Sequence, residues 1–186
     1  MLVQLLRVQI KYSAKGEVLS SLESIVLRRP ILEDGMGVYR LVESCPPLDA
    51  NSSYCNLLQC SHFSATSVAA ELAGSLVGFV SGYIVPDRGD TLFVWQVAVS
   101  KNARGVGLAS RMLSEILTRQ ECKAVEYIET TITQDNQASW ALFEGLAKKL
   151  SVNLKTSDWM DKTAHFSGLH DSETLVRIGP FIRTTK

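Results

Sequence analysis

The sequence has no excess of charge of either sign and no long apolar run. Its 186 residues include 19 Lys and Arg and 19 Asp and Glu, so the formal net charge at pH 7 is zero. This balance gives no electrostatic reason to expect nucleic acid or an anionic membrane as a partner. No apolar run approaches the roughly 20 residues that a membrane-spanning helix needs. We therefore expect no membrane association.

Cysteine is scarce and lacks a metal-binding pattern. The four cysteines form no CxxC pair and no Cys/His set of the kind that holds zinc; they are Cys45, Cys55, Cys60 and Cys122. We expect them to be small buried side chains and expect no metal site. The default is then a reduced protein in the cytoplasm.

The first 24 residues lack the features of a signal peptide. Gln4 and Arg7 interrupt the short apolar start, and no small-residue cleavage pattern follows. We interpret residues 1–24 as a poorly ordered or non-core extension. Residues 25–186 are then one domain, since the chain is long enough for a single hydrophobic core.

Repeats and low-complexity linkers are absent as well, and apolar periodicity divides the chain into short elements. The patterns predict strands at 25–30, two around a turn at 73–75, at 91–100, at 124–133 and two within 164–181. They predict helices after residues 33–35, within 46–63, at 107–120 and at 135–150, the last capped by Asp135 or Asn136. This order predicts a mixed α/β domain of the α+β type, with residues 100–132 as a β-α-β crossover.

Two glycines lie at a predicted strand-to-helix turn that is a candidate ligand-binding loop. After the predicted strand at 91–100 comes "RGVGLA", which places Gly105 and Gly107 at the mouth of a helix. Glycines let the backbone approach a ligand closely, and successive N–H groups at a helix start suit an anion. Arg104 adds a forked cationic donor. The glycine count alone equally allows a merely tight turn, and neither GxGxxG nor the GK[ST] of a Walker loop is present.

The spacing Arg-x-x-Gly-x-Ala from Arg104 to Ala109, directly after "VAV", resembles motif A of the GCN5-related N-acetyltransferases (GNAT). The segments "IETTIT" and "DNQASWALFEGL" resemble that family's fifth strand and following helix, so the resemblance spans roughly residues 25–180. It implies a GNAT fold: a central twisted, mostly antiparallel sheet with splayed central parallel strands, flanked by helices.

The resemblance also implies acetyl-CoA as the co-substrate. Backbone amides of the glycine loop would wrap its pyrophosphate, and the preceding strand would pair with its pantetheine arm. The cofactor-binding residues that follow are Val97, Ala98, Val99, Arg104, Gly105, Val106, Gly107, Leu108, Ala109, Asn136, Ser139 and Phe143.

Within this family, "LDANSSYCNLL", "FVWQVAVS" and "RGVGLASRML" are similar to segments of the L-2,4-diaminobutyrate acetyltransferases of ectoine biosynthesis. That similarity implies a diamino acid substrate acetylated on its γ-amine, and a homodimer. The candidate substrate-binding residues are Asp49, Asn51, Ser52, Tyr54, Trp95 and Gln96. Plainer roles remain open, with Asp49 and Asn51 capping a loop or helix and Trp95 packing in the core.

The acceptor amine must lose a proton before it attacks the thioester, so a base is needed. The chain departs from the common family pattern at two places: Phe143 stands where many members carry a tyrosine acid, and Gln96 where many carry a carboxylate. The catalytic candidates are therefore Glu129 as the base, His165, and Tyr54 as a donor to the thiolate. Glu129 could instead be salt-bridged or solvated, and His165 structural. Backbone amides around Val97–Val99 would stabilise the oxyanion.

Two other functions remain open from the sequence. One is acetylation of another small amine, such as a polyamine or a different diamino acid. The other is a non-catalytic acyl-CoA-binding module, which the departures at Gln96 and Phe143 keep in consideration.

Overall fold

The computed structural model describes residues 25–46, 48–49 and 51–181. The predicted extension at 1–24 lies outside the described residues. The helices and strands follow one another as β1 (Val26–Arg28), η1 (Leu32–Asp34), α2 (Gly35–Glu43), α3 (Ser53–Ser61), η2 (Ser64–Thr66), β2 (Val68–Leu72), β3 (Ser75–Ile84), β4 (Thr91–Val99), η3 (Lys101–Ala103), α4 (Leu108–Thr118), η4 (Gln120–Cys122), β5 (Tyr127–Thr133), α5 (Gln137–Leu150), β6 (Leu154–Met160) and β7 (Glu173–Ile178).

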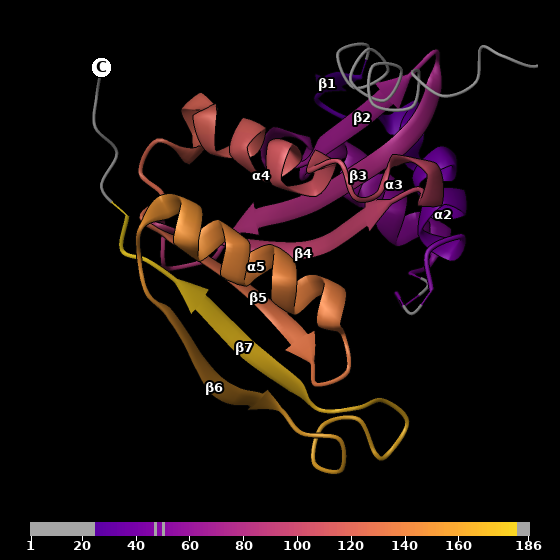
Figure 1. Ribbon diagram of the computed structural model, residues 1–186. Helices are drawn as coiled ribbons and strands as arrows, with labels where there is room; N and C mark the ends of the chain where they lie inside the picture. Colours follow the sequence, from indigo (N-terminus) through magenta and orange to yellow (C-terminus); the bar gives the residue numbers. More distant parts are fainter. Residues whose placement is uncertain (1–24, 47, 50, 182–186) are drawn as a thin grey trace, which may run out of the picture.

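The strands form one seven-stranded sheet in the order β1-β2-β3-β4-β5-β7-β6 (Figure 1). All neighbours are antiparallel except β4 and β5, which run parallel and are joined through α4. This pair is the crossover predicted for residues 100–132. The mixed, mostly antiparallel sheet with its central parallel pair confirms the predicted fold class.

The two parallel strands stay together over only three residues each. Thr91–Phe93 pairs with Tyr127–Glu129, and within the described residues the two strands make no further pairing with each other. β4 nevertheless continues on β3 as far as Val99, and β5 continues on β7 as far as Thr133. The sheet therefore opens between them, and the facing backbone edges have no strand partner there.

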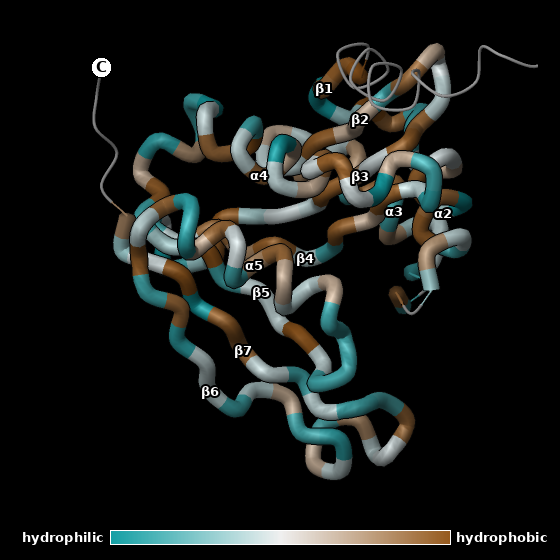
Figure 2. Tube along the Cα trace, viewed as in Figure 1, coloured by the Kyte–Doolittle hydropathy of each residue, from teal (hydrophilic) through white to brown (hydrophobic). Residues whose placement is uncertain are grey.

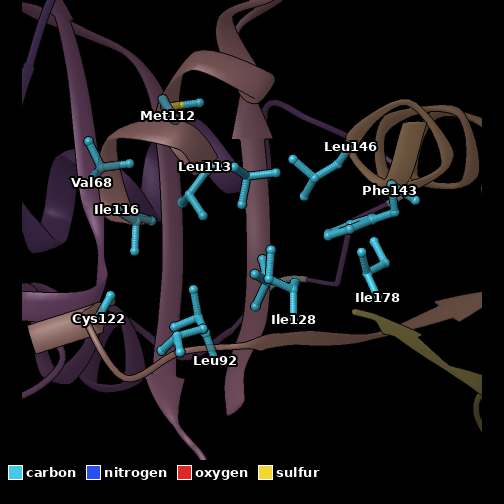
Figure 3. Close-up of a cluster of buried hydrophobic side chains, with 14 of the residues drawn as sticks. Val68, Leu92, Met112, Leu113, Ile116, Cys122, Ile128, Phe143, Leu146 and Ile178 are labelled. Atoms are coloured by element: carbon cyan, nitrogen blue, oxygen red, sulfur yellow. The ribbon is translucent and has the colours of Figure 1, made fainter. Parts of the chain in front are cut away.

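Helices cover both faces of the sheet and give it two hydrophobic cores. The larger core packs α4 and α5 on the sheet through side chains such as Met112, Leu113, Phe143 and Leu146 (Figure 3). The smaller core packs α2 and α3 on the other face, against Phe79 of β3. Burying each such aliphatic or aromatic side chain stabilises the fold by about 1.5–3 kcal/mol. These two cores therefore stabilise the sheet around the opening.

β4 carries a bulge at the point where it enters the opening. Its pairing with β3 shifts, so that Gln96 lies opposite Ser81 and Val94 lies opposite the next residue, Gly82. Trp95 is the extra residue, and an extra residue reverses the alternation of faces. Val94 and Val97 accordingly both pack in the larger core although three positions separate them. The bulge thus turns Gln96 toward the α2–α3 side.

The prediction for the C-terminal strands was half wrong. β7 lies within 164–181 as expected, but its partner β6 lies earlier, at Leu154–Met160, and residues 161–172 form the connection. β6 is an edge strand whose residues are exposed except for the half-buried Leu154. Figure 2 shows it as largely hydrophilic. Without a buried face it has no apolar alternation, which is the signal from which strands are recognised.

The remaining elements lie close to their predicted positions. α3 begins at Ser53, inside the predicted range 46–63, and the turn between β2 and β3 places Ala73 and Gly74 at positive φ. Three of the four cysteines are buried, and only Cys55 is partly exposed. In the described part of the chain no helix combines the length and apolarity needed to cross a membrane.

Candidate active site

The loop between β4 and α4 needs glycine for its backbone conformation. Gly105 has a φ of 77° and Gly107, the N-cap of α4, a φ of 76°, both in the left-handed region that favours glycine. A Cβ at either position would meet no protein atom within 4 Å. The space beside both residues is therefore open, and the first N–H groups of α4 are accessible to a ligand.

A cavity of about 350 Å³ lies against this loop. It is lined by nine of the residues predicted to bind the cofactor: Val97, Val99, Arg104, Gly105, Gly107, Leu108, Ala109, Asn136 and Ser139. The carbonyl of Val99 accepts a hydrogen bond from Nε of Arg104 at 2.9 Å, which fixes the arginine at the rim. The cavity walls thus come from β4, the glycine loop, α4 and the start of α5.

Three predicted cofactor residues do not line this cavity. Ala98 points into the smaller core, and Val106 packs against the larger one. Phe143 is buried and borders a second cavity instead. The prediction also missed Cys45, Pro46 and Leu48, which close the cavity from the segment after α2, because nothing in the local sequence places that segment beside the glycine loop.

The N-cap of α5 is Asn136. Its side-chain Oδ1 accepts from the backbone N–H of Ser139 at 3.1 Å. This confirms one of the two predicted caps, and it places Asn136 at the border of both cavities.

A second cavity, of about 220 Å³, occupies the opening between β4 and β5. Four predicted substrate residues line it: Asp49, Asn51, Trp95 and Gln96. Leu48, Val97, Asn136 and Ser139 border both cavities. A ligand reaching through the first cavity would therefore meet a small molecule in the second.

Hydrogen bonds join three segments around the second cavity. Nδ2 of Asn51 donates to Oε1 of Gln96 at 2.9 Å, and Nε2 of Gln96 donates to the backbone carbonyl of Asp49 at 3.4 Å. The carboxylate of Asp49 then lies 2.7 Å from Nε2 of His170. Oε1 of Glu173 is 3.9 Å from the same nitrogen. The histidine thus sits between two carboxylates.

This arrangement favours the charged form of His170. Nδ1 faces the carbonyl of Asp171 at 2.6 Å and Nε2 faces the carboxylate of Asp49, and both partners only accept. The pKa of His170 is raised, chiefly by the Asp171 carbonyl and further by Asp49 and Glu173, against the opposing effect of burial. Asp49 and Glu173 thus present two carboxylates to the same side-chain nitrogen, and we call this group around His170 the cation site.

Glu173 is the more buried of the two acids. Burial raises its pKa, against the effects of a hydrogen bond with Thr131 and of the charge on His170. Its Oε2 atom is buried without a hydrogen-bond partner. A carboxylate with a raised pKa and a free oxygen is suited to accept a proton inside the cavity.

The geometry corrects the prediction that Glu129 is the base. Both of its carboxylate oxygens accept from Arg88, at 2.7 and 2.8 Å, and Arg177 also pairs with it. Burial acts to raise its pKa, but the hydrogen bonds from the two arginines outweigh it, and the pKa is lowered. Glu129 lines neither cavity. The salt-bridged alternative is the one that the structure supports.

Three other predicted site residues lie away from the cavities. Ser52 caps α3 by accepting from the N–H of Cys55 at 3.2 Å. Tyr54 is 69% exposed on α3. His165 is exposed, and its Nδ1 accepts from the N–H of Asp161 within the β6–β7 connection. Helix capping accounts for Ser52, which was predicted to bind substrate, and a loop contact accounts for His165, which was predicted to be catalytic.

The sequence interpretation missed His170 and Glu173 altogether. Both belong to "HDSE" at the start of β7, whose only local signal is a histidine and an acid three residues apart. Their importance depends on the loop that brings His170 to Asp49. Among the described residues no group of three or more His, Cys, Asp or Glu side chains is arranged to hold a metal ion.

Comparison with known proteins gives consistent matches. The model of the acetyltransferase (GNAT) family matches residues 36–147. The L-2,4-diaminobutyric acid acetyltransferase of Methylotuvimicrobium alcaliphilum is 58% identical over 162 residues, which cover 87% of this chain and 94% of that protein. The enzyme of the same name from Vibrio parahaemolyticus is 54% identical, covering 82% of this chain and 84% of the relative.

A solved structure matches as well. The diaminobutyrate acetyltransferase of Paenibacillus lautus, in complex with its substrate L-2,4-diaminobutyric acid and coenzyme A, superposes with a TM-score of 0.82. It is 37% identical, and the match covers 87% of this chain and 98% of that one.

Proposed function

Since the chain belongs to the GNAT family of acetyltransferases, we propose that it transfers the acetyl group of acetyl-CoA to the γ-amine of L-2,4-diaminobutyrate. The products are N4-acetyl-L-2,4-diaminobutyrate and CoA, and the reaction is a step of ectoine biosynthesis. The observation that carries the proposal is the pair of carboxylates, Asp49 and Glu173, around His170, in a cavity that borders the glycine-loop cavity.

The first cavity takes acetyl-CoA. The pyrophosphate binds the N–H groups around Gly105 and Gly107 at the start of α4, with Arg104 nearby. The pantetheine arm follows the edge of β4 that faces the opening. This places the thioester at the border of the two cavities, near Val97, where β4 amides without a strand partner stabilise the oxyanion.

The second cavity takes the diamino acid. Asp49 and Glu173 offer carboxylates to the ammonium groups, and Trp95 offers a ring face to the methylene chain. Thr130, Thr131 and Thr133 line the same cavity. A substrate with two amines and a carboxylate matches this mixture of acids and neutral donors.

Glu173 acts as the base. An aliphatic ammonium has a pKa near 10, so a base with a raised pKa lowers the cost of removing its proton. The neutral γ-amine attacks the thioester carbonyl, and the tetrahedral oxyanion collapses as the C–S bond breaks. The nitrogen then loses its second proton to the released thiolate or to solvent, which gives the amide and CoA. The described lining of the two cavities contains no tyrosine, so CoA leaves as the thiolate, which is accessible near neutral pH.

The resemblance supports two further parts of the proposal. The enzyme acts as a homodimer, and it works in the cytoplasm, where acetyl-CoA is available.

The experiment combines the purified protein with acetyl-CoA and L-2,4-diaminobutyrate and identifies the acetylated nitrogen by NMR. We expect acetylation at the γ-nitrogen. Acetylation at the α-nitrogen would contradict the regiochemistry. Turnover only with other amines would assign a different acceptor, and tight acetyl-CoA binding without turnover across an amine panel would indicate a binding module.

A further inference from the structure

Gln96 stands where many family members carry a carboxylate, and its surroundings assign it a different task. We propose that Gln96 is a positioning residue that fixes Asp49 and Asn51 to the sheet, so that the Asp49 carboxylate lies at the cation site. The inference rests on the proposed function for its kinetic test and on geometry alone for its spectroscopic test.

The bulge in β4 makes this contact possible. If β4 alternated regularly through Trp95, Gln96 would lie on the same face as Val94 and point toward α4 and α5. With the bulge, Gln96 lies on the same face as Ala98, which packs against α2. Only 7% of Gln96 is exposed, so its amide must find partners inside the protein.

Its two partners require an amide. Nε2 donates to the backbone carbonyl of Asp49, and Oε1 accepts from Nδ2 of Asn51. The carbonyl of Asp49 can only accept, which fixes the orientation of the Gln96 amide independently of Asn51. A carboxylate at position 96 would keep the bond from Asn51 but would set an anionic oxygen against that carbonyl. The family's acid at this position is therefore incompatible with the observed contact.

Asp49 is held at two points as a result. Gln96 holds its backbone, and His170 contacts its carboxylate at 2.7 Å. Because Gln96 acts on the chain that carries the acid, losing its amide should displace the carboxylate from His170 and from the substrate. The acetyl-CoA cavity, which Gln96 does not line, should be unaffected.

The test uses Gln96→Met, which keeps the length of the side chain and removes both hydrogen bonds. We expect KM for L-2,4-diaminobutyrate to rise about tenfold, equivalent to roughly 1.4 kcal/mol, with a smaller change in kcat and an unchanged Kd for acetyl-CoA. Gln96→Glu should raise KM at least as much. Ser81→Ala is the matched control: Ser81 lies opposite Gln96 on β3 and is fully buried, but its hydroxyl has no hydrogen-bond partner.

The substrate-independent readout is the NMR titration of His170. The pKa of His170 in Gln96→Met should fall toward the pKa that His170 has in Asp49→Asn. In Ser81→Ala the pKa of His170 should equal that in the unmodified protein. An unchanged His170 titration in Gln96→Met, with KM also unchanged, would overturn the inference. If the unmodified protein fails to acetylate diaminobutyrate, the proposed function is wrong, and the titration still decides the role of Gln96.

Discussion

Oδ2 of Asp49 lies 2.7 Å from Nε2 of His170, although 121 positions separate them in the chain. The contact ties the segment between α2 and α3 to the connection between β6 and β7, across the opening of the sheet. Glu173 lies on the other side of the imidazole. Most of what we expect of acceptor binding depends on this group.

Asp49→Asn should raise KM for L-2,4-diaminobutyrate about tenfold or more, since it removes one of two charges at the cation site. The substitution keeps the shape of the side chain, so a fold defect should not contribute. Steady-state kinetics with acetyl-CoA saturating will measure it, with calorimetry of acetyl-CoA as the control. An unchanged KM would show that Asp49 does not bind the substrate.

Glu173→Gln should lower kcat about 10²-fold or more, the scale of general-base catalysis. Because burial raises the pKa of Glu173, the acidic limb of kcat/KM in the unmodified enzyme should lie above the ordinary glutamate value of 4.5. The variant should lose that limb. A full pH profile that keeps the limb in Glu173→Gln would show that another group is the base.

His170→Gln should destabilise the protein in a pH-dependent manner. The folded-state pKa of His170 is raised from its ordinary value of 6.5, so its contribution to stability is fully present below that pH and is lost as the pH rises through the folded pKa. Urea denaturation at several pH values should show the difference between the two proteins shrinking toward alkaline pH. A difference that grows with pH would contradict this sign.

Gly107→Val should abolish acetyl-CoA binding while the protein stays folded. The φ of 76° costs a branched side chain about 1–2 kcal/mol, and the new methyl groups would occupy the open space above the loop. Gly89→Val is the control, because a Cβ there also meets no atom within 4 Å and its φ is ordinary. Calorimetry and circular dichroism separate the two effects, and retained affinity in Gly107→Val would count against the cofactor site.

Glu129→Gln should affect stability more than catalysis. The carboxylate is 3% exposed and pairs with two partly exposed arginines, so the loss should be about 2–3 kcal/mol, below the range for fully buried pairs. Since the pKa of Glu129 is lowered, the stability that it contributes is present above 4.5 and is lost as the pH falls through the folded pKa. Chemical denaturation measures the loss. A large fall in kcat at unchanged stability would restore Glu129 as a catalytic candidate.

Local sequence patterns predicted most helices and strands, because apolar spacing and helix caps depend on residues that are close together in the chain. Helix α4 buries Leu108, Met112, Leu113 and Ile116 as their spacing requires, and α5 begins at a predicted cap. The prediction failed at β6, where an exposed edge strand carries no apolar alternation. It failed again at Glu129, since a strand sequence does not reveal that arginines at positions 88 and 177 will converge on it.

The sequence by itself determined the glycine loop and the strand-helix order, which form much of the wall of the cofactor cavity, because those residues are neighbours along the chain. The acceptor site was decided only by the tertiary structure. Asp49, Gln96 and His170 come from three distant segments, and a one-residue bulge sets which way Gln96 faces. Hydrogen bonds between distant segments depend on how the sheet opens and on where the loops cross it. Local sequence patterns predict neither the opening nor the paths of the loops.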